Sequence, residues 1–179
     1  MNYRRLKTPG ACYFFTVVSY NRQKIFCYDK NPYLLKESLL AVKRRHPFTI
    51  DAFILMPDHL HCIWTLPSGD SDYSLRWMLI KGLFSRQCKK LNTGTPNNRI
   101  KKREQSVWQR RFWEHQIRND KDFMQHMDYI HYNPVKHGLV KSAKEWPYSS
   151  LHRYIVAGIY PESWGRDASI NFMDNIGRE

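Results

Sequence analysis

The chain has 179 residues, of which 42% are hydrophobic and 15% aromatic, and this composition fits one globular domain with a sizeable core. Its formal net charge of +13 favours a polyanionic partner, most often a nucleic acid, over a basic surface that serves only solubility. No apolar run reaches the length of about 18 residues that a membrane span needs, and no apolar segment follows the basic N-terminus, so we expect neither a membrane protein nor a secretory signal. The four cysteines contain no Cys-x-x-Cys pair, which is typical of reduced thiols in a cytoplasmic protein.

The first half of the chain predicts a strand, a helix and two more strands. Residues 11–20 are dense in aromatic and β-branched side chains, which favours a strand. Asn31, which precedes a proline, predicts the N-cap of a helix that runs to about residue 46. Residues 48–56 and 59–66 predict two strands joined by a tight turn, and the Gly-, Ser- and Asp-rich residues 67–72 predict a loop rather than a metal site.

The second half predicts a helix, a loop, a strand and a longer helix. Residues 74–91 predict the helix, and residues 92–105 predict a flexible basic loop. Three leucines form the expected apolar stripe of that helix: Leu75, Leu79 and Leu83. Residues 108–117 alternate well enough to predict a fourth strand. Asn119 predicts the N-cap of the next helix, which we expect to end at Pro134, and a short final helix reaches about residue 158.

The element order β-α-β-β-α-β, followed by a helix, is that of the ferredoxin-like split βαβ fold. We therefore expect an α+β protein with a four-stranded antiparallel sheet, helices on one face of it, and a C-terminal helix and tail. Residues 1–158 are predicted to form a single domain. Residues 159–179 contain no periodic segment large enough for a core of their own, so we expect them to pack on the domain or on its active site.

Two histidines, His59 and His61, lie at i and i+2 in the third predicted strand. Strand side chains alternate between faces, so both imidazoles point the same way, with Cα atoms roughly 6–7 Å apart. Two imidazoles at this spacing can bind one metal ion. The alternative is a half-exposed strand that happens to contain two histidines.

A second stretch favours the metal interpretation. Tyr129 and Asn133 lie four residues apart in the last long helix, on one face and one turn apart. Beside the histidine strand, the asparagine oxygen would be a third ligand, and such a set suits Mg²⁺ or Mn²⁺, with Zn²⁺ as an alternative. The ion would act as a Lewis acid on a scissile phosphate, and Tyr129 would attack the phosphorus to form a phosphotyrosine ester.

The positive charge is concentrated in two blocks that flank the histidine strand in sequence. Residues 1–50 contain 10 Lys and Arg against 2 acidic residues, and residues 76–111 contain 11 against 1. Cations bind phosphates, and interleaved aromatic rings suit base stacking. The candidate DNA-binding residues are Arg4, Arg5, Lys81, Arg86, Arg110, Arg111 and Arg118.

These residues also resemble a known family. His59-Leu60-His61 matches the His-hydrophobic-His signature of the HUH single-strand nucleases, and Tyr129 with Asn133 resembles the helix of the single-tyrosine HUH transposases. From about residue 3 to residue 164, the chain is similar to the REP-associated tyrosine transposases, which share the order and spacing of four stretches. These are Phe112-Trp113-Glu114-His115, Asp128-Tyr129-Ile130, Asn133-Pro134-Val135-Lys136-His137-Gly138 and Trp146-Pro147-Tyr148-Ser149-Ser150.

The resemblance implies a metal-dependent endonuclease and strand transferase. Its substrate would be single-stranded DNA with imperfect palindromic hairpins, the REP elements of bacterial chromosomes, and we expect no small-molecule substrate. The resemblance implies metal ligation by His59, His61 and Asn133, and a nucleophilic Tyr129 that retains the 5′-phosphate. The wider transposase group often has Gln as the third ligand, whereas Asn follows the REP-associated subgroup. The resemblance further implies a bacterial protein of the cytoplasm and nucleoid.

Several alternatives remain open at this point. Tyr132 is a rival nucleophile, and His126, on the helix face of Tyr129, is a candidate ligand or phosphate contact. Three further histidines are expected at the polar surface or in support of the ligands: His115, His131 and His137. A non-catalytic protein that binds DNA hairpins would keep the same fold. A zinc hydrolase acting on small substrates would explain neither the basic blocks nor the tyrosine.

Overall fold

The structure, a computed structural model, describes residues 7–28, 30–88 and 107–166. Arg4, Arg5, the predicted basic loop 92–105 and the end of the predicted tail lie outside the described residues. In the described ranges, no helix combines the length and the apolar character that crossing a membrane requires.

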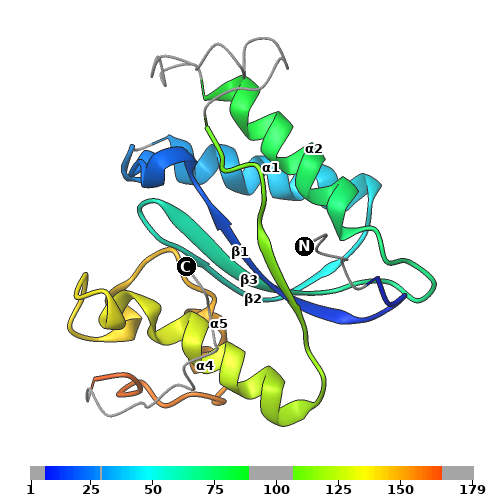
Figure 1. Ribbon diagram of the computed structural model, residues 1–179. Helices are drawn as coiled ribbons and strands as arrows, with labels where there is room; N and C mark the ends of the chain where they lie inside the picture. Colours follow the sequence, from blue (N-terminus) through cyan, green and yellow to red (C-terminus); the bar gives the residue numbers. More distant parts are fainter. Residues whose placement is uncertain (1–6, 29, 89–106, 167–179) are drawn as a thin grey trace.

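A four-stranded antiparallel sheet lies at the centre of the molecule, as predicted (Figure 1). Its strands are arranged in the order β2-β3-β1-β4. Their bounds are β1 (Cys12–Val18), β2 (Thr49–Leu55), β3 (His59–Thr65) and β4 (Trp113–Gln116). The fourth strand is shorter than predicted, because Trp108 forms only an isolated bridge with Ser19.

Helices cover both faces of this sheet (Figure 1). The two crossover helices, α1 (Asn31–Arg45) and α2 (Tyr73–Gln87), lie on one face, as the ferredoxin-like order predicts. The later helices, α4 (Asp120–Lys136) and α5 (Leu151–Val156), cover the opposite face, whereas we expected the helices on one face only. Three short 3₁₀ turns complete the described elements: Tyr20–Arg22, Ile25–Cys27 and Ala143–Glu145.

Strand alternation divides the interior into two clusters. On β1, Tyr13 and Phe15 face α1 and α2, whereas Phe14 faces α4. Trp64 of β3 stacks on Trp77 of α2, with ring centroids 4.2 Å apart and an interplanar angle of 17°. The face of the sheet toward α1 and α2 therefore carries an aromatic core. The face toward α4 carries the residues of β3 that alternate with that core.

The predictions for α1 and α2 were wrong in detail. Lys30, not Asn31, is the N-cap of α1, because the Asn31 side chain instead donates a hydrogen bond to the Ile25 carbonyl at 2.6 Å. The buried side of α2 is lined by aromatic and branched residues rather than by the three predicted leucines, of which Leu79 and Leu83 pack only partly against the core. The buried hydrophobic residues of α2 are Tyr73, Trp77, Ile80 and Phe84.

Helix α4 continues past Pro134 to Lys136, although we expected it to end at the proline. A proline inside a helix lacks the N–H that would bond four residues back. The following residues nevertheless keep helical bonds, from the His137 N–H to the Asn133 carbonyl at 3.0 Å and from the Gly138 N–H to the Val135 carbonyl at 2.9 Å. The last turn therefore adds residues to the face of α4 that begins with Tyr129.

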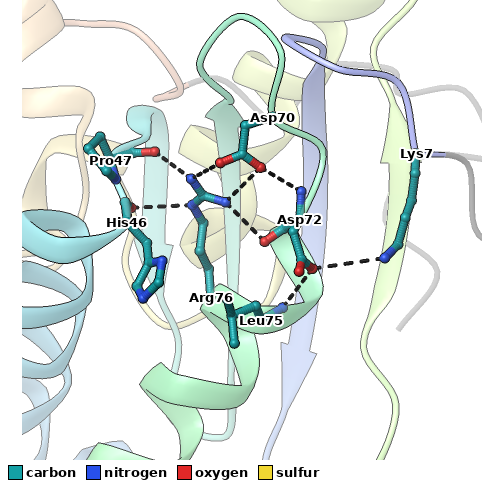
Figure 2. A network of polar contacts seen from close by, with 7 residues as sticks. All are labelled: Lys7, His46, Pro47, Asp70, Asp72, Leu75 and Arg76. Atoms are coloured by element: carbon teal, nitrogen blue, oxygen red, sulfur yellow. Dashed lines mark hydrogen bonds and ion pairs between the residues drawn. The ribbon is translucent and has the colours of Figure 1, made fainter.

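A buried arginine of α2 holds the predicted loop at residues 67–72 through hydrogen bonds (Figure 2). The Arg76 guanidinium, 2% exposed, bonds the Asp70 carboxylate at 2.6 Å and the Pro47 carbonyl at 2.8 Å. It also donates to the His46 carbonyl at 3.3 Å and the Asp72 carbonyl at 3.0 Å. One side chain thus joins the end of α1, the acidic loop and the start of α2.

Candidate active site

His59 and His61 point from β3 to the face covered by α4, as the strand period predicted. Their ring centroids are 4.9 Å apart at an angle of 74°. They are 2% and 0% exposed, so they are buried, which excludes the half-exposed strand that was the alternative. Burial of two polar rings side by side is costly unless both are engaged in specific interactions.

Each of these rings is oriented by a hydrogen bond at Nδ1. Nδ1 of His59 donates to Asp58 at 2.7 Å, and the other oxygen of that carboxylate accepts from Arg22 at 3.3 Å. His61 Nδ1 and Thr16 Oγ1 are hydrogen-bonded at 2.9 Å. Histidines that bind metals usually use one nitrogen for the ion and the other for such a partner. The two contacts therefore favour Nε2 as the ligand atom of both residues.

The charge of Asp58 is maintained despite its partial burial. Burial raises the pKa of this carboxyl, but the hydrogen bond from His59 and the charges of His59 and Arg22 outweigh it, so that the pKa lies below its usual value. An ionised acceptor holds the His59 Nδ1 proton firmly. Arg22 was not among the predicted site residues, and its contact arises from the turn Tyr20–Arg22 lying against the hairpin.

Two side chains of α4 and that of its C-cap residue, His137, follow one another at helical spacing opposite the histidine pair. The Tyr129 ring is 5.3 Å from the His61 ring, and the His137 ring is 5.7 Å from the His59 ring. Asn133 lies midway between Tyr129 and His137 in sequence, on the same helix face. Tyr129 thus lies beside His61, and the helical spacing puts Asn133 on the same helix face.

Asn133 is the clearest sign that this site takes a ligand. The side chain is 0% exposed, and among the described residues neither its amide oxygen nor its amide nitrogen has a hydrogen-bond partner. A buried amide without partners costs on the order of 1–3 kcal/mol. An ion coordinated by the amide oxygen would offset part of that cost, so the donor set fits a divalent metal.

Tyr129 is 1% exposed and contacts a cation that the sequence did not reveal. The Lys136 ammonium lies 3.4 Å from the Tyr129 hydroxyl oxygen and 4.7 Å from the ring centroid. The predicted helix end at Pro134 hid this contact, because it placed Lys136 beyond the helix. The signal that could have found it is the seven-residue spacing, which is two helical turns.

Tyr132, the rival nucleophile, packs elsewhere. It is 6% exposed, its ring lies 6.3 Å from the Trp164 ring, and Gly165 approaches it closely. Trp164 and Tyr160 follow α5, and the Tyr160 hydroxyl donates to Asp128 at 2.6 Å. The described start of the predicted tail thus packs on α4, and Tyr132 belongs to that contact.

A second histidine cluster ties β4 to α4. His115 Nε2 donates to Asp122 at 2.8 Å, and His126 Nδ1 lies 3.0 Å from the other oxygen of the same carboxylate. The donor atoms lie within 4.8 Å of one another and could hold a metal ion. The two imidazoles stack at 4.7 Å and 13°, however, so their lone pairs run side by side instead of converging on one point. This arrangement favours a structural role.

The protonation of this cluster agrees with that role. Burial lowers the pKa of His126. Burial raises the pKa of Asp122, but hydrogen bonds from His115 and the Arg118 N–H, with the charges of both histidines, bring it below its usual value. His126 also packs on Phe14 at 4.7 Å, which leaves its role as a ligand or phosphate contact a prediction.

His131 does not lie at the polar surface, one of the two places expected for it. It is 0% exposed, its Nε2 is hydrogen-bonded to Ser150 Oγ at 2.9 Å, and burial lowers its pKa to about 3. Its ring lies 5.3 Å from Tyr160 and 5.5 Å from Tyr154. His131 therefore joins α4 to α5 as a neutral core residue.

The candidate DNA-binding cations that the structure describes lie at several places in the fold. Lys81 donates to the Gln109 carbonyl at 2.7 Å and lies over the Trp108 ring at 5.8 Å, so it fastens α2 to the segment before β4. Arg110 and Arg111 precede β4 and Arg118 follows it, at the opposite end of the strand. The exposed members are Arg86, Arg110, Arg111 and Arg118.

Comparisons with known proteins agree with this arrangement. Residues 9–133 match the family model described as "Transposase IS200 like". The chain is 44% identical over 167 residues to the REP-associated tyrosine transposase of Escherichia coli K12, covering 93% of this chain and 92% of the relative. It is 45% identical over 178 residues to a Haemophilus influenzae relative that bears the same family name, covering 98% and 99%. A solved REP-associated tyrosine transposase bound to a REP hairpin matches with a TM-score of 0.80 and 41% identity, covering 96% of this chain and 94% of that one.

A histidine strand that faces a tyrosine helix across one side of a four-stranded sheet, together with the match over residues 9–133, defines a transposase of the IS200-like class. Identities of 44–45% over nearly the whole chain to two relatives place it in one group within this class. The chain belongs to the REP-associated tyrosine transposases of the IS200-like transposase family.

Proposed function

We propose that this chain is a metal-dependent single-stranded DNA endonuclease and strand transferase that acts near REP-type hairpins. The observation that carries the proposal is the position of Tyr129, whose ring lies 5.3 Å from His61 on a helix face shared with Asn133. A similar chain of 41% identity has been solved with a REP hairpin bound, which supports the substrate.

His59, His61 and Asn133 would hold the metal, for which Mg²⁺ or Mn²⁺ fits the two imidazoles and one amide oxygen. Lewis-acid polarisation of the scissile phosphate is the chemistry that such an ion supplies when bound. Asp58 and Thr16 orient the imidazoles through Nδ1.

Tyr129 performs the covalent step. Its phenol oxygen attacks the phosphorus, the bond from phosphorus to the 3′-oxygen breaks, and the 5′-phosphate stays on Tyr129 while the other piece leaves with a 3′-hydroxyl. The phosphotyrosine ester retains the energy of the broken phosphodiester, so strands can be rejoined without ATP. The exposed arginines, with Arg4 and Arg5 of the N-terminal segment, would bind the DNA backbone.

The alternative is a protein that binds DNA hairpins without cleaving them. The same fold and charge would serve that function. The Asn133 amide, which has no hydrogen-bond partner in the described part of the chain, and the facing histidine pair favour catalysis, because binding alone requires no such buried polar cluster.

The test is incubation of the protein and Mg²⁺ with a labelled hairpin oligonucleotide, followed by denaturing electrophoresis and peptide mapping. We expect a covalent adduct on Tyr129 that is absent in Tyr129→Phe, while Tyr132→Phe, its matched control, still forms it. An adduct that maps to Tyr132 would overturn the assignment. Cleavage without any adduct would indicate an activated water, and hairpin binding without cleavage would favour the alternative.

A further inference from the structure

Lys136 lies over the proposed nucleophile because α4 does not stop at Pro134. Seven residues separate Tyr129 from Lys136, which places them about 20° apart around the helix. Helical side chains lean toward the N-terminus, so a long side chain at the end of α4 reaches back over the preceding turns. The Lys136 ammonium accordingly lies 4.7 Å from the ring centroid of Tyr129 and 3.4 Å from its hydroxyl oxygen.

We propose that Lys136 is a further catalytic residue of this site, whose ammonium binds the phenol oxygen of Tyr129, aims it, and stabilises the negative charge that develops there. The inference rests on the proposed function of Tyr129. A phenol is largely protonated at neutral pH and is a weak nucleophile without such help. A donor at 3.4 Å makes a weak bond to a neutral phenol, and the same bond becomes charge-assisted as the oxygen gains negative charge. That difference between the resting state and the transition state is what accelerates a reaction.

The proposed steps balance without any proton transfer to or from Lys136. In cleavage, the bond from the phenol oxygen to phosphorus forms and the bond from phosphorus to the 3′-oxygen breaks. The phenol proton passes to solvent, the departing 3′-oxygen takes up a proton, and Lys136 keeps its own protons throughout. In rejoining, the 3′-hydroxyl attacks and the phenol oxygen leaves with developing negative charge, which Lys136 stabilises in the same way.

The position of Lys136 distinguishes this role from that of a general phosphate contact. Tyr129 is 1% exposed, whereas Lys136 is exposed, so the lysine forms a contact between a buried hydroxyl and the surface from which a substrate must approach. The contact is with the attacking oxygen itself, not with a neighbouring group of the site.

The experiment compares Lys136→Met, Lys136→Arg and the control Lys121→Met, which removes an exposed lysine from the same helix. Single-turnover cleavage is measured at saturating hairpin, rejoining is measured from the isolated adduct, and the dissociation constant is measured separately. We expect Lys136→Met to slow both cleavage and rejoining by about 10- to 100-fold with a nearly unchanged dissociation constant. Lys136→Arg, which keeps the charge, should recover most of the rate, and Lys121→Met should cleave like the parent protein.

Three results would overturn the inference. A wild-type rate at saturation for Lys136→Met with a raised dissociation constant would make Lys136 a phosphate contact. Equal loss in Lys136→Arg and Lys136→Met, with a lowered melting temperature in both, would make it structural. If Tyr129→Phe still cleaves, the proposed function fails and this inference fails with it. If Tyr129→Phe is inactive while Lys136→Met is fully active, only the inference about Lys136 fails.

Discussion

Nδ1 of His59 and the carboxylate of Asp58 lie 2.7 Å apart, although the two residues are neighbours in sequence at the tip of the β2–β3 hairpin. The turn thus provides the acceptor for the first proposed ligand from the adjacent residue. Arg22, bonded at 3.3 Å to the other carboxylate oxygen, restrains Asp58 from the far side. The orientation of His59 consequently depends on two residues that are not themselves proposed as metal ligands.

Replacing Asp58 tests this orientation. Asp58→Asn keeps the size of the side chain but weakens its grip on the Nδ1 proton, so we expect affinity for Mn²⁺ to fall by about 10- to 100-fold. Titration followed by the electron paramagnetic resonance of free Mn²⁺ measures this. Asp120→Asn, an exposed carboxylate in the first turn of α4, is the control, and equal affinities for the two variants would contradict the prediction.

The metal role of His61 needs a substitution that respects its burial. His61 is 0% exposed and packs on Phe14, so truncation to alanine would open a cavity and confuse folding with chemistry. His61→Asn keeps a polar group near Thr16 and removes Nε2. We expect cleavage in Mg²⁺ to be lost while hairpin binding and a cooperative melting transition persist. Full cleavage at ordinary Mg²⁺ concentration would exclude the role.

The Arg76 network predicts an acid-sensitive component of stability. The hydrogen bond from Arg76 lowers the pKa of Asp70 below its usual value. The contact therefore contributes stability that is complete above the unfolded value of about 4 and is lost as the pH falls through the lowered folded pKa. Because Asp70 is 36% exposed, solvent screening limits this contribution to under about 1 kcal/mol. Asp70→Asn should lose it at pH 7 and show a flatter decline of unfolding free energy below pH 4.

Removing the arginine itself should cost more. Arg76→Met leaves the His46 and Pro47 carbonyls without their buried donor, so we expect a loss of about 2–4 kcal/mol in urea unfolding. Arg86→Met, an exposed arginine of the same helix, should change stability by less than about 0.5 kcal/mol. Similar losses in both variants would show that the Arg76 network contributes no more to stability than an exposed arginine does.

Salt dependence separates the exposed arginines from Lys81. Arg110→Gln and Arg111→Gln should each reduce the slope of log affinity against log salt concentration by about 1 for a matched hairpin, measured by fluorescence anisotropy. Lys81→Met should lower the melting temperature instead, because Lys81 bonds the Gln109 carbonyl. A scrambled, unpaired oligonucleotide is the control for hairpin recognition, and equal binding of it would contradict the hairpin substrate.

The contact of the tail with α4 should be measurable. We expect Tyr160→Phe, which leaves the half-buried Asp128 without its donor, to lower unfolding free energy by about 1–2 kcal/mol. Tyr148→Phe, at an exposed tyrosine, is the control. An unchanged melting temperature in Tyr160→Phe would show that residues after Gly158 are not held by this bond.

Local periodicity was sufficient to predict the strands of the sheet and the faces on which the site residues lie. The alternation of β3 placed both histidines on one face, and the four-residue spacing placed Tyr129 and Asn133 on another that meets it. Contacts between distant segments were not predictable in this way. The guanidinium of Arg76 binds carbonyls about 30 positions away, and nothing local to residue 76 announces this.

Two local rules were overridden by packing. Proline weakens a helix by removing one hydrogen bond, but the buried face of α4 against the sheet keeps Asn133 and Pro134 helical. The rule that predicts an end at Pro134 therefore concealed Lys136, whose ammonium lies 3.4 Å from the Tyr129 hydroxyl oxygen. A histidine in a polar-looking motif was likewise expected at the surface or in support of the ligands, whereas His131 fills the space between α4 and α5.

The alternation of β3 links the aromatic core to the chemistry in a way that a list of site residues does not reveal. Leu60, Cys62 and Trp64 pack in the core with residues of α1 and α2, and the same strand presents the two histidines on its reverse side. A slip of β3 by one residue against β1 would move both imidazoles into the aromatic core and every core side chain out of it. The stacking of Trp64 on Trp77 therefore helps to fix the register of β3 against β1. A substitution that loosens this stack could disable the site from the opposite side of the sheet without altering any of the proposed site residues.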